Sequence, residues 1–368
     1  MALIQTLLVV DDDVIARMGS LVRHLCVGMI DESVLVTVLS RSASPLASEG
    51  VGVSRVVTTP RRWWPWGPAV CDSILHLLGG QRPDIVHCMS TELAQWAHRW
   101  SAKWESVLVT QLTDLEDVDR FAALRSEARM MGLAITPSIE RALLERAPEM
   151  REQVRVVPPG LPAEPEAAAF SEPDALPTAV VTAPMTRHCG LQVVFKALRL
   201  VAKEGLDLHL FVMAGGPAEA YYRRQADELE LRSRVTFAGQ MHDWATLHKA
   251  MMAADFYIDP GGGGRYTIDT LTALAGGLII LAPQGTTEDY LIDGLTARLY
   301  EPQRPRQLAE QWAAMVTDRA GSRQLAESAL QYARTNLQAS AMVSQTAALY
   351  RQLCDVQQAS VTAPAISE

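Results

Sequence analysis

Short apolar segments alternate with stretches of helical periodicity along almost the whole chain. Apolar segments bounded by turn residues predict buried strands, and the amphipathic stretches between them predict helices that cover a sheet. This order is typical of a parallel α/β fold, because neighbouring parallel strands need a crossover connection between them. In the first half, strands are expected at 3–10, 34–40, 55–59, 84–88, 107–112, 133–136 and 154–157, and helices near 14–28, 70–79, 91–103, 118–131 and 138–147.

A proline-rich segment interrupts this alternation after residue 157. Because proline ends helices and removes a hydrogen-bond donor from central strands, we interpret residues 161–177 as a semi-rigid linker between two domains. A length of 368 residues also suits two domains better than one. The pattern then resumes with strands at 178–183, 208–214, 234–238, 256–258, 278–282 and 296–300, and with late helices near 304–318, 320–335 and 339–356. We expect domains at 1–160 and 178–335, a C-terminal helix at 336–358 and a disordered tail at 359–368.

The composition narrows the class of protein. The net charge is −9 and the sequence has no block of Lys and Arg, which argues against a nucleic-acid partner. No apolar run reaches the ~18 residues of a membrane-spanning helix, and the N-terminus lacks the features of a signal peptide. The five cysteines are scattered without the spacing of a metal site, so we expect reduced thiols, no metal and a cytoplasmic location.

Three consecutive acids, Asp11, Asp12 and Asp13, follow the first expected strand. They resemble the start of a response-regulator receiver domain, in which acids hold Mg²⁺ beside a phospho-accepting aspartate. His87 stands where that aspartate is expected, which makes a receiver domain the minor interpretation. The favoured interpretation is that the acids stabilise the N-terminus of the following helix.

The second half contains a series of motifs that follow one another in a familiar order. They are 155–160 (RVVPPG), 210–217 (LFVMAGGP), 234–239 (RVTFAG), 254–260 (ADFYIDP), 273–277 (ALAGG) and 293–299 (DGLTARL). Together they resemble glycosyltransferase family 4 over residues 154–333, and 83–87 (PDIVH) is similar to a motif of the family's N-terminal domain. The resemblance implies the GT-B architecture, with two Rossmann-like domains whose parallel sheets face each other across a cleft.

The resemblance also implies an activity. Proteins of this kind transfer a sugar from a nucleotide-sugar donor to a glycan or lipid-linked acceptor, with retention of configuration and without a metal or other cofactor. Nucleotides bind such folds beyond the carboxyl ends of the strands, and diphosphates contact backbone N–H groups. The glycines in the loops that follow the strands are therefore expected at the donor; they are Gly215, Gly216, Gly239, Gly263 and Gly264.

The chain departs from the family at the side chains that carry the chemistry. The family's Arg and Lys that neutralise the leaving diphosphate correspond to Pro184 and Cys189. The two acids of its Glu-x₇-Glu motif correspond to Gly264 and Thr272. A lost charge-assisted hydrogen bond costs about 1.5–3 kcal/mol, so two lost cations weaken diphosphate stabilisation by about 3–6 kcal/mol.

Nearby residues are candidates to replace the lost groups. Arg187, His188 and Arg265 are candidate phosphate contacts, although a solvated loop charge is the slightly favoured interpretation of Arg187 and Arg265, and an ordinary loop histidine that of His188. Asp269, and more weakly Thr272, are candidates for a ribose hydroxyl, while Asp269 could instead interact with the dipole of its own helix. Either Glu288 or Asp289 corresponds to a further acid of the family.

Two clusters of tryptophan remain. Trp63, Trp64 and Trp66 lie beside two arginines and predict either a peripheral contact with the inner membrane face, a platform for the acceptor, or rings packed on their own domain. Trp96, Trp100 and Trp104 recur every four residues and predict one packed helix face.

Two functions follow as hypotheses. The first is a glycosyltransferase that uses a nucleotide-sugar donor. The second is a catalytically inactive homologue that binds or scaffolds a partner, because all of the signature side chains are replaced.

Overall fold

The computed structural model describes residues 3–40, 55–58, 68–124, 129–161, 169–170, 175–239, 241, 244–261 and 266–362. The chain divides into two compact units. The first unit contains Met1–Gly160 together with Ala339–Glu368, and the second contains Leu161–Gln338. The C-terminal helix therefore belongs to the same unit as the N-terminal half of the chain.

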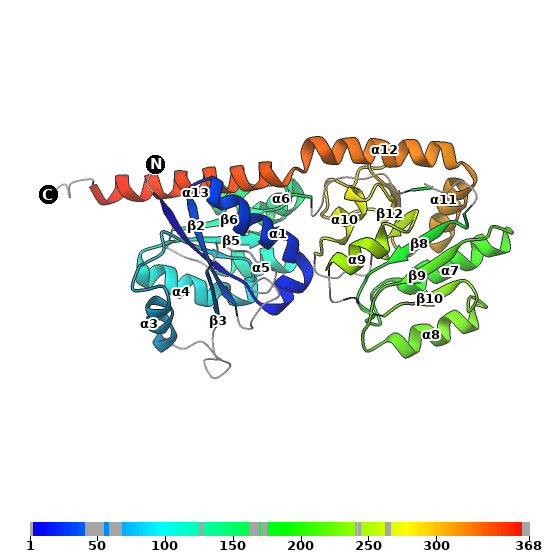
Figure 1. The fold of residues 1–368 in the computed structure, drawn as a ribbon, viewed down its shortest axis with the longest axis horizontal. Coiled ribbons are helices and arrows are strands. Elements are labelled where there is room, and N and C mark those ends of the chain that lie inside the picture. Colours follow the sequence, from blue (N-terminus) through cyan, green and yellow to red (C-terminus); the bar gives the residue numbers. More distant parts are fainter. Residues whose placement is uncertain are drawn as a thin grey trace. The chain divides into compact units, whose positions relative to one another are not determined.

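The first unit is built on a parallel sheet (Figure 1). The order of its strands is β3-β2-β1-β4-β5-β6-β7. Its strands are β1 (Ile4–Val9), β2 (Val34–Ser40), β3 (Arg55–Thr58), β4 (Ile85–Cys88), β5 (Val107–Leu112), β6 (Met130–Ala134) and β7 (Val154–Val156). Its helical segments are α1 (Asp12–Asp31), α3 (Pro68–Leu77), η2 (Thr91–Leu93), α4 (Ala94–Trp104), α5 (Leu115–Ala122), α6 (Pro137–Arg146), η3 (Pro148–Gln153) and α13 (Ala339–Thr362). Each strand pairs in parallel with its neighbours, as the alternating pattern predicts.

Helix starts in the first unit follow local capping signals. Asp11 is the N-cap of α1, and its carboxylate accepts a hydrogen bond of 2.8 Å from the Val14 N–H. Helix α6 begins at Pro137 behind the N-cap Thr136. The acids at 11–13 thus start a helix, and His87 is fully buried within β4. This arrangement supports the capping interpretation over the receiver domain.

The helix expected at 118–131 is wrong at both ends. Helix α5 starts at Leu115, behind the N-cap Asp114, and ends at Ala122. Met130 already belongs to β6, where every residue is buried. The apolar residues at 130–134 pair with β5 rather than continue a helix, so a long-range contact overrides the local periodicity.

Helix α13 packs along α1 in the first unit (Figure 1). The Tyr350 hydroxyl lies 2.5 Å from Nδ1 of His87, and both side chains are buried. Arg351 pairs with Glu32 at the end of α1. Helix α13 extends to Thr362, so the first residues of the tail expected at 359–368 are helical, and 363–368 lie outside the described residues.

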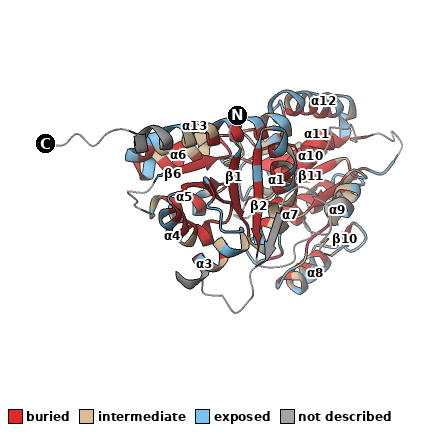
Figure 2. Ribbon diagram, turned by 60° about the vertical axis from the view of Figure 1, so that its left-hand side comes forward, coloured by how far each residue is buried: buried red, intermediate tan, exposed pale blue. Residues whose placement is uncertain are grey.

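The second unit has a parallel sheet of its own, with the order β10-β9-β8-β11-β12-β13. The strands are β8 (Thr178–Val181), β9 (His209–Val212), β10 (Val235–Phe237), β11 (Phe256–Ile258), β12 (Ile279–Pro283) and β13 (Arg298–Tyr300). The helices are α7 (Leu191–Lys203), α8 (Glu219–Glu228), α9 (Trp244–Met251), α10 (Asp269–Ala275), α11 (Pro305–Thr317) and α12 (Arg319–Asn336). Figure 2 shows that buried residues concentrate in the strands and on the helix faces that cover them.

Aromatic side chains fill the core of the second unit. Phe256 contacts both Phe170 and Trp312, with ring centroids 5.5 and 6.3 Å apart. The carboxylate of Asp255 accepts backbone N–H bonds from Phe170 and Thr178, at 2.6 and 2.9 Å. The end of the expected linker is therefore attached to this sheet, whereas its residues 162–168 and 171–174 lie outside the described part of the chain.

Two further expectations concern the tryptophan clusters and the absence of a membrane-spanning helix. Trp100 and Trp104 are buried on α4 with ring centroids 6.3 Å apart, while Trp96 is half-buried below the Arg99 guanidinium. Trp63, Trp64 and Trp66 lie outside the described residues. Among the helices that the structure describes, none combines the length and the apolar character needed to cross a membrane.

Candidate functional site

The predicted donor residues that the structure describes lie at the carboxyl end of the second sheet. Strands β9 and β10 are added on one side of β8, and β11, β12 and β13 are added on its other side. The strand order therefore reverses between β8 and β11, which makes this position the topological switch point of the sheet. Parallel α/β sheets bind ligands beyond their carboxyl ends at such a switch point. The loops that start at Thr182 and Asp259 flank this position.

The glycine turn after β9 is joined to the loop after β8 through the backbone. The Met185 N–H donates to the Gly215 carbonyl at 3.0 Å, and the Ala218 N–H donates to the Met185 carbonyl at 2.9 Å. Gly216 has a φ of +153°, and a Cβ at this position would lie 2.7 Å from the Met185 carbonyl oxygen. Only glycine allows this close approach of the two loops.

The residues at the family's Arg and Lys positions do not supply a cation. Pro184 is exposed in the loop after β8. Cys189 is buried, and its thiol donates to the Tyr222 hydroxyl at 3.3 Å. This side chain therefore points into the core of the second unit. Arg187 and His188, in the same loop, are both exposed.

The two candidates for a ribose hydroxyl, Thr272 and Asp269, behave differently. Thr272 is buried in α10 and donates its hydroxyl to the Ile268 carbonyl at 2.9 Å, so its hydrogen-bonding capacity is used inside its own helix. Asp269, the first residue of α10, is half-buried and accepts a hydrogen bond of 2.6 Å from the Thr182 hydroxyl. Asp269 is thus linked to the end of β8.

Glu288 lies in the loop after β12 and joins a second hydroxyl network. The Thr270 and Tyr290 hydroxyls donate to the same oxygen of this carboxyl, at 2.7 and 2.6 Å. Burial, and next the charge of Asp259, raise the pKa of Glu288 to about 7. Burial also raises the pKa of Asp269 and of Asp259, and Asp269 contributes to the increase at Asp259.

Thr270, which bonds to Glu288, is the chain neighbour of Asp269, and Asp259 and Glu288 follow the adjacent strands β11 and β12, so the three carboxyls share one region at the strand ends. Asp259 follows β11 directly and accepts the Gly261 N–H at 2.9 Å. Sequence reasoning found Asp269 and Glu288 but missed Asp259. The available signal was an acid between a buried strand and a glycine run.

The remaining predicted residues separate into two groups. Gly239 follows β10 with a φ of +80° and has open space around its Cα. Gly263, Gly264 and Arg265 lie outside the described residues. In the part of the chain that the structure describes, no group of three or more His, Cys, Asp or Glu side chains is arranged to hold a metal ion.

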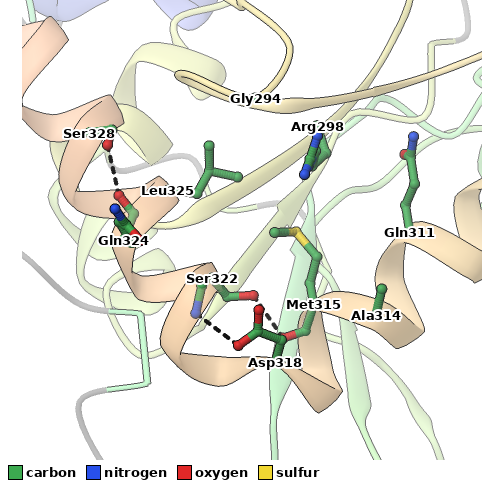
Figure 3. Close-up of a pocket in the computed structure, with 11 residues that line it drawn as sticks. Gly294, Arg298, Gln311, Ala314, Met315, Asp318, Ser322, Gln324, Leu325 and Ser328 are labelled. Atoms are coloured by element: carbon green, nitrogen blue, oxygen red, sulfur yellow. Dashed lines mark hydrogen bonds between the residues drawn. The ribbon is translucent and has the colours of Figure 1, made fainter.

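A pocket of about 410 Å³ lies elsewhere in the second unit (Figure 3). It is bounded by α11, α12 and the beginning of β13, with Arg298, Met315 and Leu325 among its lining residues. The pocket adjoins the start of β13, whereas the residues predicted for the donor follow the ends of strands. None of those predicted residues lines the pocket.

Comparisons with known proteins agree with this geometry. Residues 177–318 match the family model described as glycosyl transferases group 1. No curated protein sequence matches the chain. Among solved structures, sucrose-phosphate synthase from Thermosynechococcus elongatus has a TM-score of 0.77 at 19% identity, with 96% of this chain and 100% of that chain covered.

Two further structures are similar over nearly the whole chain. HepE from Anabaena, solved in complex with UDP, has a TM-score of 0.75 at 13% identity, and the alignment covers 95% of this chain and 100% of the HepE chain. The lipopolysaccharide outer core galactosyltransferase WaaB has a TM-score of 0.68 at 12% identity, with 95% and 100% covered. The chain therefore has the GT-B fold, and its match to the group 1 glycosyl transferase model lies within the second unit.

Proposed function

We propose that this protein transfers a sugar from a nucleotide-diphosphate donor to a hydroxyl group of a glycan or a lipid-linked acceptor. The observation that carries the proposal is the group of carboxyls formed by Asp259, Asp269 and Glu288 at the switch point of the sheet. Carboxylates accept hydrogen bonds from hydroxyl groups, and a nucleotide sugar presents hydroxyls on both its ribose and its sugar. The group 1 family model covers the same region.

The donor's diphosphate is the leaving group, so negative charge increases on it in the transition state. Groups that stabilise this charge lower the barrier more than groups that merely bind the donor. We propose that the loop after β8 and the turn at Gly215 and Gly216 contact the diphosphate, while Asp269 and Glu288 accept hydrogen bonds from donor hydroxyls. On this proposal the reaction uses no cofactor besides the donor.

The acceptor side of the proposal rests on the first unit. In the sequence, Trp63, Trp64 and Trp66 combine large apolar rings with neighbouring arginines, a composition suited to the interface of a membrane. A protein that modifies a lipid-linked acceptor at the cytoplasmic membrane face would use such a contact. Vesicle sedimentation of the chain and of a Trp63→Ser/Trp64→Ser/Trp66→Ser variant tests this part of the proposal.

The activity itself is tested by incubating the full-length chain with a panel of UDP- and GDP-sugars and measuring the released nucleotide. At least one donor should be turned over or hydrolysed. At pH 8, where Glu288 is ionised, Asp269→Asn and Glu288→Gln should each raise the donor KM by about tenfold or more, because each removes a charged acceptor. Asp227→Asn, on the exposed side of α8, is the matched control and should leave the KM unchanged. Absence of released nucleotide with every donor would refute the proposed activity.

A second candidate function is a binding protein without catalysis. The observation that favours it is Cys189, because a buried thiol replaces a cation of the family. This candidate predicts that no donor is consumed, that UDP and GDP raise the melting temperature weakly or not at all, and that a partner enzyme co-purifies. Turnover that is lost in the Glu288→Gln variant would exclude it.

A further inference from the structure

The loop after β8 carries an arginine that lies over an aromatic ring of helix α8. Cζ of Arg187 lies 5.0 Å from the centroid of the Tyr221 ring, in the first turn of α8. Arg187 is exposed, and within the described part of the chain its guanidinium forms no ion pair. A positive charge is thus held in a defined place without a carboxylate to neutralise it.

The backbone on both sides of Arg187 is fixed to the segment that carries Tyr221. Met185 exchanges backbone hydrogen bonds with Gly215 and Ala218. The Tyr222 hydroxyl donates to the Thr186 carbonyl at 2.8 Å and accepts from the Cys189 thiol. The loop from 185 to 189 is therefore anchored before and after Arg187 to the turn and helix that follow β9.

We propose that Arg187 is the cation that contacts the donor's diphosphate and that the Tyr221 ring is its positioning residue. The inference rests on the proposed function, since it assigns the diphosphate contact of that same site. It also accounts for two replacements in the loop. Pro184 cannot supply a charge, and Cys189 is used to anchor the loop through Tyr222.

The chemistry of the guanidinium group suits this arrangement. An arginine stacked on a ring uses the face of its planar group, and the N–H donors along its edge stay available. Those donors bind phosphate oxygens in pairs, which gives stronger and better oriented contacts than a single point charge. The ring also limits the number of positions that the long side chain can adopt before the donor binds.

Binding of UDP and of uridine to the full-length chain separates the diphosphate contact from the nucleoside contact. Calorimetry should show that Arg187→Ala weakens UDP binding by about ten- to a hundredfold, as expected for the loss of charge-assisted hydrogen bonds. The affinity for uridine should not change. GDP and guanosine are titrated in parallel, so that a preference for the other base is detected.

The role of Tyr221 is tested with two substitutions. Tyr221→Leu removes the aromatic face and should weaken UDP binding by about two- to fivefold. Tyr221→Phe keeps the face and should restore the affinity. In the Arg187→Ala background, Tyr221→Leu should have no further effect, since the two residues act as one unit. Arg223→Ala is the matched control, because Arg223 also lies over a ring, that of Phe237, at 4.5 Å. This control should bind UDP like the unmodified protein.

The outcomes distinguish this inference from the proposed function. If the unmodified chain binds neither UDP nor GDP and releases no nucleotide, both are refuted. If it binds and turns over a donor while Arg187→Ala keeps its UDP affinity, only the inference is refuted. If Tyr221→Phe is as weak as Tyr221→Leu, the ring is not what positions Arg187. An equal loss of uridine affinity in Arg187→Ala would show that the loop itself has been disturbed and would likewise contradict the assignment.

Discussion

Glu288→Gln should make the protein more stable above neutral pH while it impairs donor binding. In the folded chain the pKa of Glu288 is raised from 4.5 to about 7, first by burial and then by the charge of Asp259. Gln has the same shape and keeps an oxygen that accepts from Thr270 and Tyr290. The substitution therefore removes the charge and leaves the hydroxyl network in place.

The magnitude follows from the two pKa values. A rise from 4.5 to about 7 corresponds to roughly 3 kcal/mol in favour of the protonated form. The side chain is half-buried, and solvent that reaches it reduces this to about 1–3 kcal/mol. Between these pH values the folded state holds a proton that the unfolded chain has lost. The stability contributed by this group is therefore complete below pH 4.5 and is lost as the pH rises through 7.

The assay is urea unfolding at pH 5 and pH 8, followed by hydrogen exchange in peptides from β12 so that the second unit is measured separately. At pH 8 the Glu288→Gln variant should exceed the unmodified protein by about 1–3 kcal/mol in its free energy of unfolding, whereas at pH 5 the difference should fall to about a quarter of that value. Glu310→Gln, at an exposed position on α11, serves as the control and should change neither value by more than about 0.5 kcal/mol. Equal stability of the variant and the unmodified protein at pH 8 would refute the reasoning. So would the same gain at both pH values, because that gain would come from packing instead of charge.

Other substitutions test the packing around the site and the anchor of α13. Gly216→Ala should lower the free energy of unfolding by about 2–4 kcal/mol, because the new Cβ would clash with backbone atoms of Met185. Gly205→Ala should lower it by only about 1–2 kcal/mol, because φ is positive there but the space around the Cβ position is open. Urea unfolding measures both values. Thr272→Val should leave the donor KM within about twofold, since the threonine hydroxyl is bonded inside its helix; a tenfold rise in steady-state assays would place it at the donor instead. Tyr350→Phe should reduce stability by about 1–3 kcal/mol in thermal unfolding, because it leaves a buried His87 nitrogen without its partner; an unchanged melting temperature would contradict this.

Local patterns predicted most of the fold. The strand expected at 107–112 coincides with β5, and the helix expected at 304–318 differs from α11 by one residue at each end. Buried parallel strands are short apolar runs bounded by turns, so their signal lies within a few neighbouring residues. The same signal misled at 118–131, where an apolar run that pairs with β5 continues the periodicity of the helix before it.

The candidate site was predicted only in part. Asp269 and Glu288 were found because the motif order places them near the donor, and the structure joins them to hydroxyls of Thr182, Thr270 and Tyr290. Asp259 was not found, since no spacing in the sequence links it to Glu288. The contact between Arg187 and Tyr221 was equally hidden, because it joins the loop after β8 to the helix that follows β9.

The sequence by itself determined the alternation of strands and helices, the restart after the proline-rich segment, and the loss of the family's signature side chains. These properties depend on residues close together in the chain, where periodicity, caps and turns act. Tertiary structure decided which side chains meet. It paired His87 with Tyr350 across 263 positions and buried Cys189 in the core of the second unit. It also brought Asp259 to Glu288 at the carboxyl ends of adjacent strands. The physical reason is that the order of strands in a sheet sets which loops are neighbours, and that order arises from packing between segments that are distant in the chain.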